Sequence, residues 1–302
     1  LMGLIEIGSP VFKNNTMQIA VASGKGGTGK TTVAVSLFHF WKKFFNEKVH
    51  LVDCDVEEPN DALFFPSLET LEQKQVYQYI PEIDTSVCTF CKKCAEWCEF
   101  NAITVVANRQ FAEVDTSLCH SCGACLVACP ENAFTEKPHP LGVITRYLTE
   151  NGNEFTEGRL EVGSAMQTML IKELKKEVNP GINFTILDAP PGTSCPVVET
   201  VSDADYVILV TEPTPFGLHD LKITVELMNE LKKPFGVVVN KAGLGSGDVY
   251  TFLNKNNIEL LGEIPFSKEL VRMYSSGELL GNIPEELKET YRGIIEKITC
   301  RK

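Results

Sequence analysis

The sequence predicts an α/β protein with a doubly wound, mostly parallel sheet, interrupted by a smaller α+β insertion that is rich in cysteine. Short apolar runs alternate with helical patterns along most of the 302 residues, which is typical of a parallel sheet covered on both faces. The alternation breaks between residues 85 and 136, where eight of the 11 cysteines lie. Because it resumes afterwards, this block is interpreted as an insertion and not as a tandem domain.

The elements of the larger domain follow from local pattern. Each expected strand is a short apolar run bounded by turn residues, and the runs lie at 18–22, 49–55, 184–192, 205–213, 235–241 and 258–265. Helices are expected at 30–45, 164–178, 217–232, 247–256 and 284–298, the last with apolar residues at 3.6 spacing. Residues 142–162 are expected to form a hairpin with a turn at 150–153, and the segment 137–140 (KPHP) a stiff linker before it.

The charge balance limits the kinds of partner. There are 28 Lys and Arg against 40 Asp and Glu, a net charge of −12, which argues against general binding to nucleic acid or to anionic membranes. No apolar stretch approaches the ~20 residues of a membrane span, and no signal peptide is visible, so a cytoplasmic location without membrane insertion is expected. Residues 1–16 are interpreted as an added extension before a natural start at Met17, with an ordinary N-terminal extension as the alternative.

The segment 22–32, ASGKGGTGKTT, fits the phosphate-loop pattern G-x-x-x-x-G-K-[ST]. An apolar run precedes it and a helical pattern follows, which argues against a mere glycine-rich turn. Backbone N–H groups of such a loop and of the following helix N-terminus form a cradle for anions. Lys30 would reach the β- and γ-phosphates, and the Thr31 hydroxyl would bind Mg²⁺. The predicted nucleotide-binding residues of the loop are Gly24, Gly26, Gly27, Thr28, Gly29, Lys30, Thr31 and Thr32.

The cysteine block contains an internal repeat at a constant offset of 31 residues. Each copy has the spacing C-x₂-C-x₂-C-x₃-C, the bacterial ferredoxin run, in which the fourth cysteine of one run ligates the other cluster. The sequence therefore predicts two [4Fe–4S] clusters. One would be held by Cys88, Cys91, Cys94 and Cys129, and the other by Cys98, Cys119, Cys122 and Cys125.

Two features of the block leave other interpretations open. Pro130 follows Cys129 as the ferredoxin run requires, but Glu99 follows Cys98, and this carboxylate could tune one cluster's potential. Zinc also binds C-x₂-C pairs, although four cysteines per run, repeated twice, exceed what tetrahedral zinc sites usually show. Disulfides are disfavoured in a cytosolic protein. Outside the block, Cys195 could join a bridging site in a dimer, but a structural thiol is favoured there.

Three segments carry a family resemblance. KGGTGKT, with the additional Lys25, resembles the deviant Walker A motif of the MinD/ParA/Mrp ATPases, which include the nitrogenase iron protein. Residues 51–60, LVDCDVEEPN, resemble the switch I of that family, and residues 186–196, ILDAPPGTSCP, its Walker B and switch II. The resemblance covers 17–84 and 137–302, and it implies a P-loop NTPase with a bacterial-ferredoxin-like domain inserted at 85–136.

The resemblance also implies catalytic roles. Lys25 would reach across an ATP-dependent homodimer to the partner's phosphates, Lys30 would stay on its own nucleotide, and Asp55 would orient or activate the attacking water. Asp53 and Asp188 would join Thr31 around Mg²⁺. The alternative for Asp53 and Asp55 is a solvated strand end.

Three further residues are carried over from the family. Gly192 would lie near the γ-phosphate, Asn240 would contact the base, and Pro265 would flank it. A simple polar residue at a strand end is the alternative for Asn240.

The expected function is a dimeric switch that binds and slowly hydrolyses ATP, stimulated by a partner, with ATP or ADP, Mg²⁺ and two [4Fe–4S] clusters as cofactors. It would serve ATP-dependent electron transfer to, or maturation of, a partner metalloprotein, a redox or iron–sulfur client. Electron transfer is favoured because eight cysteines hold clusters tightly. The insertion leaves the chain soon after switch I, so the clusters are expected to respond to the γ-phosphate. The alternatives are an iron–sulfur assembly or carrier ATPase, a ParA/MinD-like positioning ATPase with a structural ferredoxin module, and a ferredoxin store.

Overall fold

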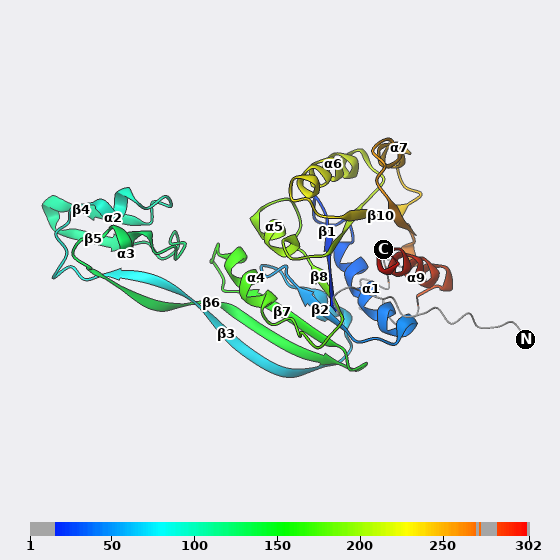
Figure 1. Ribbon diagram of the computed structural model, residues 1–302, viewed down its shortest axis with the longest axis horizontal. Helices are drawn as coiled ribbons and strands as arrows, with labels where there is room; N and C mark the ends of the chain where they lie inside the picture. The colour runs from blue at the N-terminus through cyan, green and yellow to red at the C-terminus, as the bar shows by residue number, and fades with distance from the viewer. Residues whose placement is uncertain (1–15, 270–271, 273–282, 301–302) are drawn as a thin grey trace, which may run out of the picture.

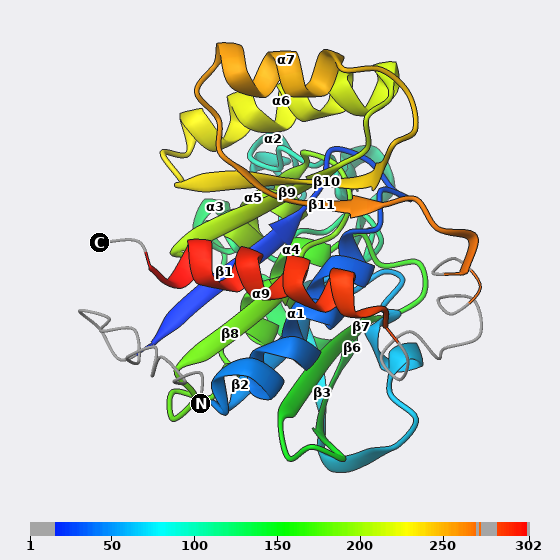
Figure 2. The same cartoon turned by 90° about the vertical axis from the view of Figure 1, so that its right-hand side faces the viewer.

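The computed structural model describes residues 16–269, 272 and 283–300, and within them nine strands form one sheet in the order β11-β10-β9-β1-β8-β2-β7-β6-β3 (Figures 1 and 2). The strands of this sheet are β1 (Met17–Ala22), β2 (Val49–Asp53), β3 (Leu68–Ile83), β6 (Phe134–Thr149), β7 (Glu154–Leu160), β8 (Phe184–Asp188), β9 (Tyr206–Thr211), β10 (Phe235–Ala242) and β11 (Leu260–Pro265). A separate two-stranded sheet contains β4 (Ile103–Val106) and β5 (Phe111–Val114).

Helices cover both faces of the large sheet. The α-helices are α1 (Lys30–Phe45), α2 (Lys93–Glu96), α3 (Ala124–Ala128), α4 (Gln167–Lys175), α5 (Cys195–Val201), α6 (Pro215–Glu230), α7 (Asp248–Lys255) and α9 (Glu285–Thr299), and the 3₁₀ turns are η1 (Asp61–Phe64) and η2 (Ala107–Arg109). Apolar side chains of α1 and α9 pack in one core, and those of α4 to α7 pack in the core on the opposite face. This is the doubly wound arrangement that the sequence predicts, with every expected strand and helix present.

The order of the strands brings the loops of the predicted site together. All pairings from β11 to β7 are parallel, so the carboxyl ends of these strands meet at one edge of the sheet. Asp53 and Asp188, the last residues of β2 and β8, are paired across that edge. The apolar run at 184–192 is a strand only as far as Asp188, and the rest of it forms a loop over the edge.

A two-stranded arm carries the insertion away from the sheet (Figure 1). β3 and β6 are antiparallel over their whole length, from Leu68 opposite Thr149 to Ile83 opposite Phe134. β7 reaches along β6 only to Gly142, so residues 77–83 and 134–140 form a ribbon beyond the sheet. At ~3.3 Å per residue this ribbon is about 23 Å long. The insertion is therefore held at a distance from the nucleotide edge, and the expected response of its clusters to the γ-phosphate stays a prediction.

The expected linker at 137–140 is part of β6, paired with residues 77–80 of β3. Pro138 and Pro140 fit into this strand because a strand offers its N–H groups to one neighbour only at alternate residues. Pro138 and Pro140 are two residues apart, so their nitrogen atoms point to the same side of β6. That side can be the edge that β7 does not cover, where no N–H group is needed for pairing. The expected hairpin at 142–162 is confirmed as the end of β6, its turn and β7.

The N-terminal segment lies almost entirely outside the residues that the structure describes. The extension predicted at 1–16 lies outside the described residues apart from Thr16. In the part of the chain that the structure describes, no helix has the length and apolar character of a membrane span.

Candidate functional site

The glycine loop between β1 and α1 lines a cavity of about 420 Å³ at the carboxyl edge of the sheet. Gly27 and Gly29 have φ values of +77° and +89°, a conformation that side chains with a Cβ rarely adopt. A Cβ on Gly29 would also collide with the side-chain amide of Asn240. The backbone conformation therefore favours glycine at both positions, and at Gly29 the close approach of Asn240 requires it as well.

Lys30 and Thr31, the first residues of α1, converge on Asp188 at the end of β8. Lys30 Nζ lies 2.8 Å from Asp188 Oδ1, and Thr31 Oγ1 donates to Asp188 Oδ2 at 2.7 Å. Burial alone would lower the pKa of Lys30, but the surrounding carboxylates outweigh it, Asp188 most of all, and the pKa is raised. Lys30 therefore carries a charge at neutral pH.

Asp53 organises the loop that follows β2. Its carboxylate accepts backbone hydrogen bonds from Asp55 at 3.0 Å, Asn60 at 2.9 Å and Asp61 at 3.1 Å. Burial, followed by the nearby charge of Asp188, raises the pKa of Asp53 to about 7. Asp53 thus fixes the course of residues 55–61 in addition to lying beside Asp188.

Asp61 is a member of this site that the sequence does not reveal. It is fully buried, and neither of its carboxylate oxygens receives a hydrogen bond from the described residues. One oxygen each from Asp53, Asp61 and Asp188 lie within 4.8 Å of one another. Burial, together with these two neighbours, raises the pKa of Asp61 well above its usual range. Three buried carboxyl groups beside one lysine disfavour one another's ionised forms until a cation is bound, and oxygen donors of this kind fit Mg²⁺.

The other predicted nucleotide residues surround the same cavity. Asp55, Asn240 and Pro265 line it, and Asn240 Nδ2 donates to the carbonyl oxygen of Thr28 at 2.7 Å. Burial is the main reason that the pKa of Asp55 is raised. Gly192 is not among the lining residues, but its N–H donates to the Ser23 carbonyl at 2.9 Å and so joins the loop after β8 to the start of the glycine loop.

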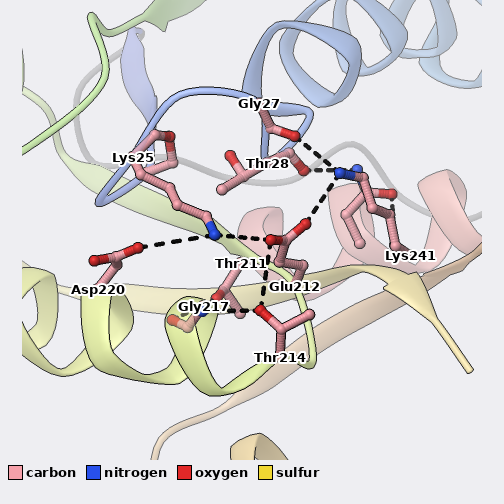
Figure 3. A network of polar contacts seen from close by, with 11 residues as sticks. Lys25, Gly27, Thr28, Thr211, Glu212, Thr214, Gly217, Asp220 and Lys241 are labelled. Carbon is pink, nitrogen blue, oxygen red and sulfur yellow. Dashed lines mark hydrogen bonds and ion pairs between the residues drawn. The ribbon is translucent and has the colours of Figure 1, made fainter. Parts of the chain in front are cut away.

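Lys25 lies against its own subunit (Figure 3). Its Nζ is 2.8 Å from Glu212 Oε1 and 4.0 Å from Asp220 Oδ2, and its side chain is 31% exposed. The role across a dimer stays a prediction, because a single chain shows only the contacts that Lys25 makes within it.

The eight block cysteines surround two separate cavities at the tip of the arm. One is lined by Cys88, Cys91, Cys94 and Cys129, and the other by Cys98, Cys119, Cys122 and Cys125. Each cavity thus contains three cysteines from one run and the fourth from the other run. The grouping is the one that the crossed ferredoxin pattern predicts.

The repeat extends to the backbone around the thiols. The N–H groups of Phe90 and Ser121 point to Cys88 Sγ at 3.4 Å and to Cys119 Sγ at 3.5 Å, and these two residues, 31 positions apart, have φ values of +53° and +51°. The same relationship joins the N–H groups of Ala102 and Ala133 to Cys98 and Cys129, both at 3.3 Å. Hydrogen bonds to sulfur are one of the means by which proteins tune iron–sulfur clusters.

The spacing of the thiols argues against zinc. Four thiolates bound to one Zn²⁺ at ~2.3 Å in tetrahedral geometry would lie about 3.8 Å apart. Among the described cysteines, no three bring their Sγ atoms within 4.8 Å of one another. Burial raises the pKa of Cys125 to about 11, so this thiol is protonated until a metal binds.

The remaining cysteines lie elsewhere. Cys54 is fully buried directly after β2, and burial raises the pKa of its thiol. Cys195 is exposed at the first residue of α5, and Cys300 is exposed after α9. A structural role fits Cys54, and none of the described cysteines pairs with Cys195 as a disulfide.

A parallel sheet with a glycine loop after β1, and with the lysine and threonine of α1 directed at an aspartate after β8, defines a P-loop nucleotide-binding protein. The chain belongs to the CobQ/CobB/MinD/ParA nucleotide binding domain family, because the model of that family matches residues 19–280.

Similar proteins agree with this assignment. An uncharacterized protein of Methanocaldococcus jannaschii is 30% identical over 285 residues, which cover 93% of this chain and 96% of that protein. An iron-sulfur cluster carrier protein of Pyrococcus abyssi is 26% identical, over 82% of this chain and 73% of that protein. The septum site-determining protein MinD of Pyrococcus horikoshii, solved with Mg-ADP, shares the fold with a TM-score of 0.56, at 18% identity over 94% of this chain and 96% of that one.

Proposed function

We propose that the protein is an ATP-hydrolysing, dimeric switch whose nucleotide state controls two [4Fe–4S] clusters at the tip of its arm. The clusters serve ATP-dependent electron transfer to, or maturation of, a partner metalloprotein. The observation that carries this proposal is the continuity of the arm with the nucleotide edge, since both belong to one sheet (Figure 1).

The nucleotide half of the proposal depends on the residues around the glycine loop. Lys30 leaves Asp188 for the β- and γ-phosphates, and Asp188 is then available, with Thr31 and Asp53, to hold Mg²⁺. A bound Mg²⁺ would supply positive charge to offset the charge on the transferring phosphoryl group. Asp55 lines the cavity and orients the attacking water. The water oxygen bonds to the γ-phosphorus as the bond to ADP breaks, and Asp55 accepts the proton.

The cluster half depends on the two cysteine-lined cavities. Each has four thiols with backbone N–H groups directed at sulfur, and no three of the described cysteines bring their Sγ atoms within 4.8 Å of one another. A [4Fe–4S] cluster would supply one-electron chemistry there. Cys91 and Cys122 are the exposed members of the two sets, so each cluster has a side that a partner protein can approach.

The two halves are coupled through a short piece of chain. Asp53 holds residues 55–61 by backbone hydrogen bonds, η1 begins at Asp61, and β3 begins at Leu68. A rearrangement of residues 55–61 around the γ-phosphate would therefore act on the start of β3, the strand that continues through the sheet into the ribbon at residues 77–83. Ordering and release of such segments by nucleotide is a known way to switch proteins.

A second candidate function is delivery of clusters to client proteins. The observation that favours it is that relatives matching over most of their length are named iron-sulfur cluster carrier proteins. The nucleotide machinery would then be the same, but the clusters would leave the protein.

One set of anaerobic measurements separates these functions. Purified protein is expected to contain about eight irons per chain as two four-iron clusters. Addition of ATP should shift the EPR midpoint potential or the rate of reduction, and the shift should remain after gel filtration with the iron still bound. An unmoved potential with an unchanged rate would contradict electron transfer. ATP-dependent loss of iron to an apo-ferredoxin acceptor would instead support the carrier function.

A further inference from the structure

Glu212, in the loop between β9 and α6, contacts two lysines that come from different parts of the nucleotide site (Figure 3). Its Oε1 lies 2.8 Å from Lys25 Nζ, and its Oε2 lies 3.0 Å from Lys241 Nζ. Glu212 is only 14% exposed. Burial would raise its pKa, but the two lysines outweigh burial and the pKa is lowered. Glu212 is therefore a charged bridge at neutral pH.

On one side, the bridge is joined to the residues proposed to bind the base. Lys241 Nζ also donates to the Gly27 carbonyl at 3.0 Å, and the preceding Asn240 donates to the Thr28 carbonyl at 2.7 Å. The backbone N–H of Lys241 donates to Asn240 Oδ1 at 2.8 Å. Hydrogen bonds thus join Asn240 and Lys241 to the glycine loop, and both residues line the nucleotide cavity.

On the other side, Glu212 sets the direction of Lys25. The ammonium group lies between Glu212 and the more distant Asp220 of α6, 4.0 Å away, with the exposed ring of Phe216 6.0 Å away. A lysine that reaches the phosphates of a second subunit must first leave Glu212. Removal of one partner from a buried pair leaves an uncompensated charge and is strongly unfavourable. Here Lys241 stays behind and continues to compensate Glu212.

We propose that Glu212 is a positioning residue that holds Lys25 on its own subunit, and that Lys241 allows its release. Nucleotide binding at Asn240 and Lys241 holds Lys241 in its ion pair with Glu212. When Lys25 leaves, the carboxylate of Glu212 therefore still has a cationic partner. Lys241 already contacts Glu212 without nucleotide, so nucleotide binding favours the release of Lys25 by holding Lys241 in that contact. This inference rests on the proposed dimeric switch and deepens it.

The first test measures Lys25 in the nucleotide-free, full-length protein. Acetylation by an N-hydroxysuccinimide ester, followed by mass spectrometry, gives the rate at which each lysine reacts. In Glu212→Gln the neutral amide weakens the ion pair, and Lys25 should react about tenfold faster, as expected for the loss of a charged hydrogen bond that solvent partly screens. Lys74, paired with Glu177 on the surface, is the internal control and should not change. An equal rate for Lys25 in both proteins would overturn the proposal.

The second test measures the ATP concentration that gives half-maximal dimer in sedimentation velocity. Glu212→Gln should need less ATP than the wild type, and Lys241→Met should need more, because Glu212 then holds Lys25 alone. A purely structural role for Glu212 predicts that both variants need more ATP, which would refute the inference. Wild-type protein that stays monomeric at saturating ATP would contradict the dimeric switch itself, while the acetylation rates would still decide the role of Glu212.

Discussion

Asp53 and Asp188 occupy paired positions on β2 and β8, and both side chains are buried at the carboxyl edge of the sheet. Asp61 joins them from η1, so three carboxylates share a space in which Lys30 is the ammonium group in direct contact. Like charges at this separation repel strongly in a buried environment. The nucleotide-free site is therefore arranged for a cation that is not part of the chain.

Asp61→Asn is expected to stabilise the nucleotide-free protein and to weaken Mg²⁺-dependent nucleotide binding. The amide keeps the shape but removes an acid whose ionised form is disfavoured by burial and by the neighbouring carboxylates, a gain of roughly 1–3 kcal/mol. Differential scanning fluorimetry without nucleotide should show a higher Tm, and titration with Mg-ADP a weaker Kd. Glu69→Gln, on the exposed edge strand β3, is the matched control and should change neither. A lower Tm for Asp61→Asn would show that the carboxylate has a partner that the cluster geometry does not reveal.

Asp61 also shows where inference from the sequence ends. Strands and helices of the main sheet follow from their apolar runs, because burial on both faces leaves a clear pattern. β3 does not follow, since Leu71, Tyr77 and Tyr79 are exposed and the strand is stabilised by β6 alone over much of its length. The roles of Asp61 and Glu212 come from contacts with residues distant in the chain, which no local motif records.

The crossed arrangement of the two cysteine runs predicts a specific pattern of iron loss. Cys129→Ser should remove the cluster of Cys88, Cys91 and Cys94, and leave about four irons per chain. Adding Cys88→Ser should remove no further iron, because both cysteines line one cavity. Adding Cys119→Ser in place of Cys88→Ser should remove the remaining cluster. Iron analysis and EPR check this, and the reverse result for the two double variants would mean that each run holds its own cluster.

We expect the buried His50 to lower the free energy of unfolding at acidic pH. It is buried on β2, with Nε2 2.8 Å from Thr156 Oγ1 and with the Asn179 N–H directed at Nδ1 at 3.4 Å. Burial lowers its pKa to about 4, and Arg146 acts in the same direction while Glu154 opposes it. In the folded state the group binds its proton less tightly than in the unfolded state. The free energy of unfolding therefore keeps the full contribution of neutral His50 above pH ~6.5. It loses roughly 3 kcal/mol as the pH falls toward 4.

The check is urea unfolding between pH 4 and 7 of wild type and His50→Gln, both without iron so that cluster loss does not interfere. The free energy of unfolding of the wild type should fall more steeply toward low pH than that of the variant. Parallel curves would mean that His50 titrates normally in the folded protein.

Because the ribbon of β3 and β6 joins the nucleotide site to the clusters, we expect that softening it weakens their coupling while both sites stay intact. Tyr77 and Tyr79 lie on the exposed face of the ribbon, whereas Gln78 and Ile80, which point the other way, are buried. Replacement of both tyrosines by glycine softens the two strands without opening a core, because glycine in a strand costs about 0.5–1 kcal/mol in backbone order. Tyr77→Phe with Tyr79→Phe keeps the ring and the strand preference, and is the matched control.

The glycine variant should retain its iron and its ATPase rate, but ATP should shift the cluster potential by less than half of the wild-type value. A full shift in the glycine variant would show that nucleotide state reaches the clusters by another route, such as direct contact of the insertion with the partner subunit.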